Sequence, residues 1–112
     1  MTVHSIAGAR GSGKTTKLFE YIIKWQSENE GRVFVTSFHG NWMRLCYNEA
    51  RRLGITDIQF VSSSALIEHL IGRNNGLVAI DEFQNYTIEQ QDKLRYRIRL
   101  SNMDLAYTWG YD

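Results

Sequence analysis

The sequence predicts a three-layer α/β fold, in which about five parallel strands form one sheet with helices on both faces. Two observations support this prediction. Five short apolar runs alternate with helical patterns along the 112 residues, and a glycine-rich stretch, residues 8–13, joins the first run to the first helical pattern. Each helix would return the chain to a parallel strand by a right-handed crossover. One minimal domain, residues 1–112, accounts for the sequence, because neither a linker nor an internal repeat is visible.

Five strands are expected from the apolar runs, at residues 2–8, 32–38, 57–61, 76–82 and 104–109. Residues 77–80 are apolar without interruption, which is typical of a parallel strand that is buried on both faces. Such a strand delivers the residues that follow it to the carboxyl edge of the sheet, where open α/β folds bind ligands.

Four helices are expected between these strands, over Lys14–Glu28, 42–53, 65–72 and 87–100. The first carries Leu18, Ile22 and Trp25 at helical spacing. Short polar side chains accept hydrogen bonds at helix starts, so Asn41 is expected to cap the second helix and Ser63 or Ser64 the third. Gly54 and Gly72 are expected to close these two helices.

The last helical segment has a second interpretation, because three arginines alternate with apolar residues in it. Helix is favoured over strand for residues 87–100. Arg95, Arg97 and Arg99 would then form either a solvated face or a strip that contacts phosphates, including an arginine finger that acts in trans.

The glycine-rich stretch fits the pattern G-x-x-x-x-G-K-[ST], after an expected strand and at the start of an expected helix. Its backbone N–H groups would point at phosphate oxygens, and the helix N-terminus would add partial positive charge. Lys14 would reach the β- and γ-phosphates, and the Thr15 hydroxyl would coordinate Mg²⁺. The expected phosphate-binding residues are Gly8, Ala9, Arg10, Gly11, Ser12, Gly13, Lys14, Thr15 and Thr16.

A second motif follows the buried strand, where Asp81 and Glu82 stand side by side. Asp81 would hold Mg²⁺ directly or through water, and Glu82 would orient and deprotonate the nucleophile that attacks the γ-phosphate. ATP is the expected nucleotide, because the sequence contains no Asn-Lys-x-Asp run of the kind that confers guanine specificity.

Together the two motifs resemble those of P-loop NTPases, and the Asp-Glu pair is similar to the subclass with a catalytic glutamate beside the magnesium aspartate. The resemblance implies that strand 104–109 inserts between strands 2–8 and 76–82. It also implies that Thr108 lies near the γ-phosphate as a sensor. Strand 2–8 would then lack its usual outer neighbour, and a bare edge there would favour a partner subunit.

Three families share more than these motifs with the chain. "SGKTTKL" (12–18), "FHG" (38–40) and "VAIDEFQNY" (78–86) are similar to segments of type II thymidine kinases, which implies phosphate transfer to a deoxynucleoside with Glu82 as base. "IDEFQNYTIEQQDKL" (80–94) and "AYTWGYD" (106–112) resemble the first RecA-like domain of superfamily 1 helicases. This second resemblance implies that Gln84 couples the nucleotide state of the protein to DNA.

The third resemblance is to phage DNA-packaging ATPases, which carry an arginine in the loop, like Arg10, and an Asp-Glu-Phe ending, like residues 81–83. Such proteins work as rings in which a neighbour supplies a further arginine. The expected partners are therefore ATP, DNA or RNA, and either further copies of the chain or a partner domain that supplies an arginine.

Charge, hydropathy and the spacing of cysteine and histidine limit the partners and sites that are expected. The net charge is +1, so charge alone favours neither nucleic acid nor an anionic membrane, and no apolar run is long enough to span a bilayer. Cys46 is the single cysteine, and the histidines His4, His39 and His69 have no metal-ligand spacing. A cytoplasmic protein without a membrane partner is expected. Trp25, Trp42 and Trp109 are expected to pack in the core or at its rim.

Three functions are compatible with the motifs. The first is a Mg-dependent ATP-hydrolysing protein that is associated with nucleic acid and is helicase-like or packaging-like. The second is a nucleoside or deoxynucleoside kinase, and the third is a nucleotide-gated binding protein with little turnover. DNA-stimulated hydrolysis, phosphate transfer to a deoxynucleoside, and tight binding without hydrolysis would distinguish them in that order.

Overall fold

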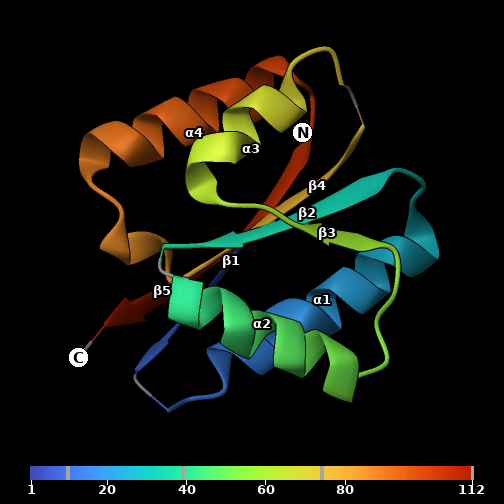
Figure 1. Ribbon diagram of the computed structural model, residues 1–112, viewed down its shortest axis with the longest axis vertical. Coiled ribbons are helices and arrows are strands. Elements are labelled where there is room, and N and C mark those ends of the chain that lie inside the picture. Colours follow the sequence, from blue (N-terminus) through green and yellow to red (C-terminus); the bar gives the residue numbers. More distant parts are fainter. Residues whose placement is uncertain (10, 39, 74, 112) are drawn as a thin grey trace.

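The computed structural model describes residues 1–9, 11–38, 40–73 and 75–111 (Figure 1). In chain order the elements are β1 (Val3–Ala9), α1 (Lys14–Glu28), β2 (Arg32–Ser37), α2 (Gly40–Arg52), β3 (Ile58–Phe60), α3 (Ser63–Leu70), β4 (Gly76–Asp81), the 3₁₀ helix η1 (Phe83–Asn85), α4 (Ile88–Leu100) and β5 (Asp104–Tyr111). The three-layer α/β fold predicted from the sequence is confirmed.

The five strands form one sheet in the order β1-β5-β4-β2-β3, and all neighbours run parallel. The last strand, β5, therefore lies between β1 and β4, as the family resemblance implied. Residue pairs such as Ala7 with Trp109 and Ile80 with Tyr107 set the register. This order brings the carboxyl ends of β1, β5 and β4 side by side, although the first and last strands are far apart in the sequence.

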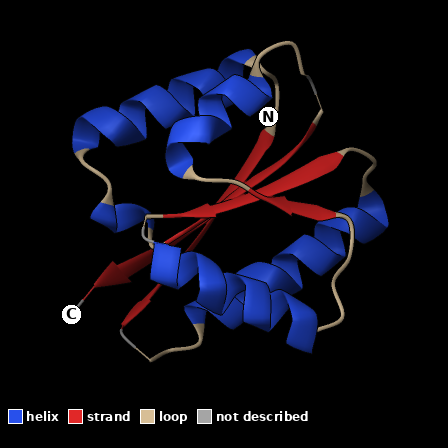
Figure 2. Ribbon diagram, in the orientation of Figure 1, coloured by secondary structure: helices blue, strands red, loops and turns tan. Residues whose placement is uncertain are grey.

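Helices α1 and α2 cover one face of the sheet, and α3 and α4 cover the other (Figures 1 and 2). Strand residues alternate between the two layers of the core. Val33 and Leu77 pack in the cluster under α1, whereas Phe34 and Val78 pack in the cluster under α3 and α4. Continuous burial of β4 on both faces explains its uninterrupted apolar sequence.

Two of the expected helix starts differ from the structure. The expected caps Ser63 and Ser64 are wrong, because both lie in the first turn of α3 and Ser62 is the cap, its side chain accepting a hydrogen bond from the Ala65 N–H. Ser62 has the extended backbone that lets a side chain reach back to the first free N–H groups. Asn41 lies inside α2, which begins at Gly40, and so it does not precede the helix.

The segment for which helix was favoured over strand is the helix α4. Thr87 and Gln90 form a reciprocal capping box at its start. Of its arginines, Arg95 is half-buried, with its guanidinium 4.9 Å from the centre of the Phe83 ring and 5.2 Å from that of Tyr107. This cation–π packing holds Arg95 against its own chain. Arg99 is exposed.

Strand β1 lies at one edge of the sheet, and its side chains are mostly exposed, with Val3 47% accessible. Among the described residues no strand pairs with the outer side of β1. An unpaired parallel edge of seven residues offers free backbone donors and acceptors. The bare edge considered from the sequence is therefore present.

Candidate functional site

The glycine-rich stretch forms a tight loop between β1 and α1. Gly11 and Gly13 have φ angles of 78° and 80°, a left-handed conformation in which a side chain would be strained. At Gly8, a Cβ atom would lie 2.4 Å from Ser12 Oγ, so the loop can close over this position because no side chain is there. Arg10 lies outside the described residues. The glycines at these positions let the loop turn sharply in front of the α1 N-terminus.

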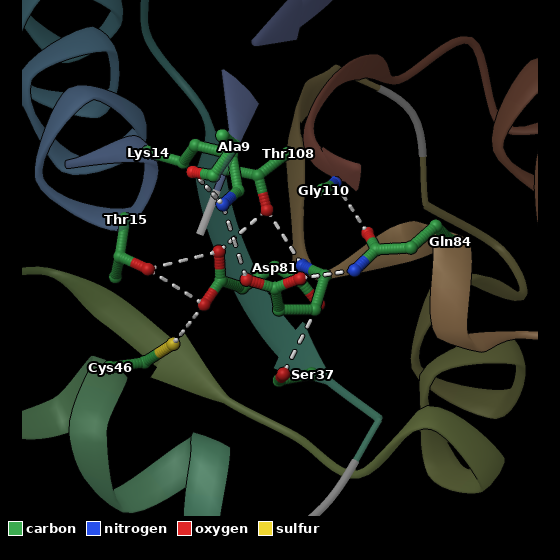
Figure 3. Close-up of polar contacts among 10 residues, drawn as sticks. Ala9, Lys14, Thr15, Ser37, Cys46, Asp81, Gln84, Thr108 and Gly110 are labelled. Atoms are coloured by element: carbon green, nitrogen blue, oxygen red, sulfur yellow. Dashed lines mark hydrogen bonds and ion pairs between the residues drawn. The ribbon is translucent and has the colours of Figure 1, made fainter. Parts of the chain in front are cut away.

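Lys14 is the first residue of α1, and its side chain turns back over the loop (Figure 3). It is 7% exposed; its Nζ donates to the Ala9 carbonyl oxygen at 3.2 Å and lies 3.8 Å from Glu82 Oε1. A buried ammonium with a carbonyl and a carboxylate as neighbours is well placed to exchange them for anionic oxygens of a ligand. Lys14 thus supplies the positive charge at the mouth of the loop.

Thr15 and Asp81 meet directly, although they are far apart in the sequence. The Thr15 hydroxyl donates to Asp81 Oδ2 at 3.0 Å (Figure 3). Asp81 is 1% exposed, and burial raises the pKa of its carboxyl group, while hydrogen bonds from Thr108 and Thr15 partly oppose that rise. A buried carboxylate beside a hydroxyl is an oxygen donor set of the kind that Mg²⁺ prefers.

Thr108 connects the two acidic residues from its place near the end of β5. Its hydroxyl donates to Asp81 Oδ1 at 2.7 Å and accepts from the Glu82 N–H at 2.7 Å. Both bonds are made by one fully buried oxygen. The residue expected to act as a sensor therefore contacts the residues expected to bind metal and to act as base.

Glu82 has a backbone conformation that nothing in the sequence suggested. Its φ and ψ angles are 57° and 51°, in the left-handed region that is unusual for a residue other than glycine, asparagine or aspartate. The N–H bond to Thr108 and the 3₁₀ helix that follows hold this conformation. Backbone strain of this kind is concentrated at functional sites. The turn directs the Glu82 carboxylate toward Lys14.

Gln84 lies beside Glu82 and reaches the end of β5. Its amide nitrogen donates to Glu82 Oε2, and its amide oxygen accepts from the Gly110 N–H at 2.8 Å. Gln84 therefore fixes the Glu82 carboxylate relative to the strand that carries Thr108.

The side chain of Thr16, one of the residues expected to bind phosphate, is hydrogen-bonded to another helix. Its hydroxyl donates to Glu49 Oε2 of α2 at 2.6 Å, and this bond is the largest cause of the lowered pKa of Glu49. The side chain of Thr16 is thus used between α1 and α2, which leaves its backbone N–H as the group that could meet a phosphate.

A pocket of about 390 Å³ opens beside these residues. Its lining residues come from α1, α2, the η1 segment and β5, and they are Lys14, Trp42, Glu82, Gln84, Asn85, Gly110 and Tyr111. The rings of Trp42 and Tyr111 are both partly exposed. The pocket exceeds the space that one water molecule needs, so it has room for a larger nucleophile or for a group from a partner.

Sequence reasoning missed two residues that contact Asp81. The Ser37 hydroxyl donates to the Asp81 carbonyl oxygen at 3.1 Å, and the Cys46 thiol lies 3.5 Å from Asp81 Oδ2. Ser37 ends β2, the neighbour of β4, so strand order could have indicated it. Cys46 comes from the middle of α2, and nothing in its sequence position indicates the contact.

Cys46 should react very slowly with alkylating reagents in the folded protein. Its side chain is fully buried, and burial together with the neighbouring Asp81 carboxylate raises the pKa of the thiol, so little thiolate is present. Labelling by iodoacetamide, followed by mass spectrometry, should proceed in denaturant and be slowed at least about a hundredfold in buffer. Rapid native labelling would contradict the packing of α2 against Asp81.

Thr108→Val should lower the free energy of unfolding more than Thr108→Ser does. Valine has the same shape but removes both hydrogen bonds, which leaves the buried Asp81 carboxyl and the Glu82 N–H with one partner fewer. Loss of such buried bonds costs about 1–3 kcal/mol of unfolding free energy, and serine retains the hydroxyl. Urea unfolding measures the difference. Equal stability of the valine, serine and wild-type proteins would show that these bonds are not formed.

The tryptophans and histidines occupy varied places. Trp25 is buried and its indole N–H donates to Asp104 at 2.8 Å, and Trp109 packs against Phe83. Trp42 is 36% exposed and lines the pocket beside Lys14. His4 stacks on Tyr21, His69 lies near Phe34, and His39 is outside the described residues. In the described part of the chain, no three His, Cys, Asp or Glu side chains gather as a metal site. None of the helices described has the length and apolar run that a membrane crossing requires.

Comparison with known proteins adds no assignment. No protein-family model matches the chain, and no curated protein sequence matches it significantly.

Proposed function

We propose that the protein is a Mg-dependent P-loop ATPase of the cytoplasm that works with nucleic acid, in a helicase-like or packaging-like role. One observation carries the proposal. Lys14 and Thr15 at the start of α1 meet Asp81 at the end of β4 and Glu82 directly after it, with a Thr15 to Asp81 hydrogen bond of 3.0 Å and a Lys14 to Glu82 separation of 3.8 Å. These four side chains are the ones that the sequence motifs select for phosphate and magnesium chemistry.

The proposed chemistry is mainly electrostatic. The N–H groups at the start of α1 and the Lys14 ammonium would hold the phosphate oxygens, and their charge would stabilise the transition state. Glu82 would accept the proton of the attacking water, while Thr108 and Gln84 hold its backbone and carboxylate in place. Thr15 and Asp81 would hold Mg²⁺, which neutralises phosphate charge when bound.

The direct test is phosphate release from Mg-ATP by the purified chain, alone and with single-stranded DNA, double-stranded DNA, RNA or thymidine. Hydrolysis that requires Mg²⁺, stops in EDTA and rises with nucleic acid is the expected result. Nucleotide affinity is measured in parallel by titration of a fluorescent ATP analogue. Absence of Mg-ATP binding would reject the proposal.

A kinase remains the second candidate, and a specific observation favours it. The pocket of about 390 Å³ beside Lys14 and Glu82 has room for an acceptor larger than water, and Trp42 and Tyr111 could pack against an acceptor ring. Transfer of the γ-phosphate to thymidine or another nucleoside would support it.

A third candidate, a nucleotide-gated binding protein with little turnover, is favoured by the Lys14 to Glu82 contact, because it pairs the proposed base with the proposed phosphate-binding lysine. Tight nucleotide binding with negligible hydrolysis in every reaction mixture would support it.

The bare edge of β1 supports the proposal of a partner subunit or partner domain, which could also supply an arginine to the site. Sedimentation velocity with and without Mg-ATP would detect association of the chain with itself. A monomer under both conditions would favour a separate partner.

A further inference from the structure

A second pocket, of about 300 Å³, lies at the carboxyl end of the sheet on the α3 and α4 side, away from the glycine-rich loop. Figure 1 shows the N-terminal ends of α3 and α4 and the η1 turn together at this end of the molecule. The residues that line the pocket are Phe38, Ser63, Ser64, Ile67, Tyr86, Gln90, Lys93 and Leu94. None of them belongs to the site formed by Lys14, Thr15, Asp81 and Glu82.

The pocket has an aromatic and aliphatic wall. The Phe38 and Tyr86 rings meet edge to face with their centres 5.3 Å apart, and Ile67 and Leu94 continue the apolar surface. Tyr86 is almost fully buried, whereas Phe38 is 38% exposed, so part of its surface is accessible. Rings at such a wall can contact a flat π system by stacking or by their edges.

Polar groups are placed around this wall. Ser64 in the first turn of α3 offers a hydroxyl, which can donate and accept, and Gln90 of α4 offers its amide N–H₂ group, because its amide oxygen already accepts from the Thr87 N–H. The exposed Lys93, one turn further along α4, offers a positive charge. An apolar wall with a few hydrogen-bonding groups is typical of small-molecule sites, and about 300 Å³ is at the lower end of their size range.

Hydrogen bonds connect the aromatic wall of this pocket to Asp81 at the end of β4. The Tyr86 hydroxyl bonds with the Ser63 hydroxyl, which lies 3.3 Å from the Ser37 carbonyl oxygen. The Ser37 hydroxyl in turn donates to the Asp81 carbonyl oxygen at 3.1 Å. A ligand against Tyr86 would therefore act on a network that ends at Asp81.

The η1 segment provides a second connection, because only three residues separate Glu82 from Tyr86. The Gln91 amide of α4 donates to the Tyr86 carbonyl oxygen at 2.9 Å and also contacts that of Phe83 at 3.4 Å. A movement of Tyr86 or of α4 would therefore displace the turn that orients Glu82.

We propose that this pocket binds one nucleobase together with its sugar-phosphate. The base would lie against Phe38, its hydrogen-bonding edge would face Gln90 and Ser64, and the phosphate would lie near Lys93. A nucleotide combines a flat ring, mixed donors and acceptors and a negative charge, and each has a counterpart in the lining. The bound nucleotide is either a free mononucleotide or one unit of a single strand. Its effect on hydrolysis rests on the proposed function, whereas its binding does not.

Binding is tested by fluorescence anisotropy with a labelled oligothymidylate of about 12 nucleotides, which exceeds one base site. Competition by thymidine monophosphate, and the loss of binding when the probe is an abasic strand, distinguish a free nucleotide, a strand and simple phosphate attraction. Phe38→Ala should weaken binding about tenfold, the scale of one lost stacking contact. Lys93→Ala should lower the dependence of log affinity on log salt by about one unit.

Matched controls make the outcome decisive. Tyr96→Ala removes a ring of α4 that lies outside the pocket and is more exposed than Phe38, at 54% against 38%, and Lys24→Ala removes an exposed charge of α1, so neither should change binding. Ser64→Trp should block the pocket at an exposed position if Phe38→Ala does not fold. Undetectable binding of the oligothymidylate and of thymidine monophosphate, equal binding of the abasic strand, unchanged affinity in a folded Phe38→Ala or Ser64→Trp protein, or an equal loss in Tyr96→Ala would overturn the proposal. Lys14→Ala should still bind the oligothymidylate. A failure of the nucleotide-pocket proposal can therefore be distinguished from a failure of the ATPase proposal.

Discussion

Lys14→Ala is expected to abolish tight binding of Mg-ATP. The wild-type ammonium is buried at the mouth of the glycine-rich loop and already lies near two oxygens, those of Ala9 and Glu82. Replacement of these neighbours by phosphate oxygens would form charge-assisted hydrogen bonds of about 1.5–3 kcal/mol each. Two such bonds correspond to an affinity loss of at least about a hundredfold. Titration of a fluorescent ATP analogue measures the change.

Lys17→Ala is the matched control, because it removes an exposed lysine from the same helix, one turn further on. It should bind the nucleotide like the wild type. Thermal unfolding should show that both variants are folded, since Glu82 keeps its bond from Gln84 when Lys14 is replaced. Equal affinity in Lys14→Ala and the wild type would reject the assignment of the loop to phosphate binding.

Glu82→Gln is expected to bind Mg-ATP and to lose turnover. Glutamine has nearly the shape of glutamate and can still bond with Gln84, but its amide cannot accept a proton from water at neutral pH. General-base catalysis contributes about 10²- to 10⁴-fold, and the rate of hydrolysis should fall by that amount. Single-turnover phosphate release measures the chemical step, and analogue titration measures binding.

Glu20→Gln controls for the loss of one negative charge, because Glu20 is exposed on α1. It should hydrolyse ATP at the wild-type rate. If Glu82→Gln retained its rate to within about twofold, Glu82 would not be the base, since removal of a general base costs far more. A kinase mechanism makes the same prediction for phosphate transfer, so this variant tests the base and leaves the acceptor open.

Much of the fold could be predicted from the sequence, because local patterns encode it. The span of α1 is the one expected from its apolar stripe, and each expected strand lies within about two residues of the observed one. Boundaries were less accurate where several candidates were adjacent, as with Ser62, Ser63 and Ser64. There the backbone angle at one serine, which the sequence does not specify, selects the cap.

The central place of β5 was available from the family resemblance but not from periodicity. An apolar run at the end of a chain does not reveal which two strands it separates. Its insertion between β1 and β4 brings Thr108 to Asp81 and leaves β1 at the edge. Long-range pairing of this kind depends on the packing of all layers at once.

The loop, the Asp-Glu pair and the alternation of strands and helices could be recognised in the sequence, because each depends on residues that are close together in the chain. Their surroundings become visible only in the folded chain: the Cys46 and Ser37 contacts, the Gln84 connection to Gly110, and the left-handed turn at Glu82. So does the pocket between α3 and α4, whose lining comes from four separate segments. Contacts between distant segments follow from strand order and helix packing, and these are properties of the folded chain.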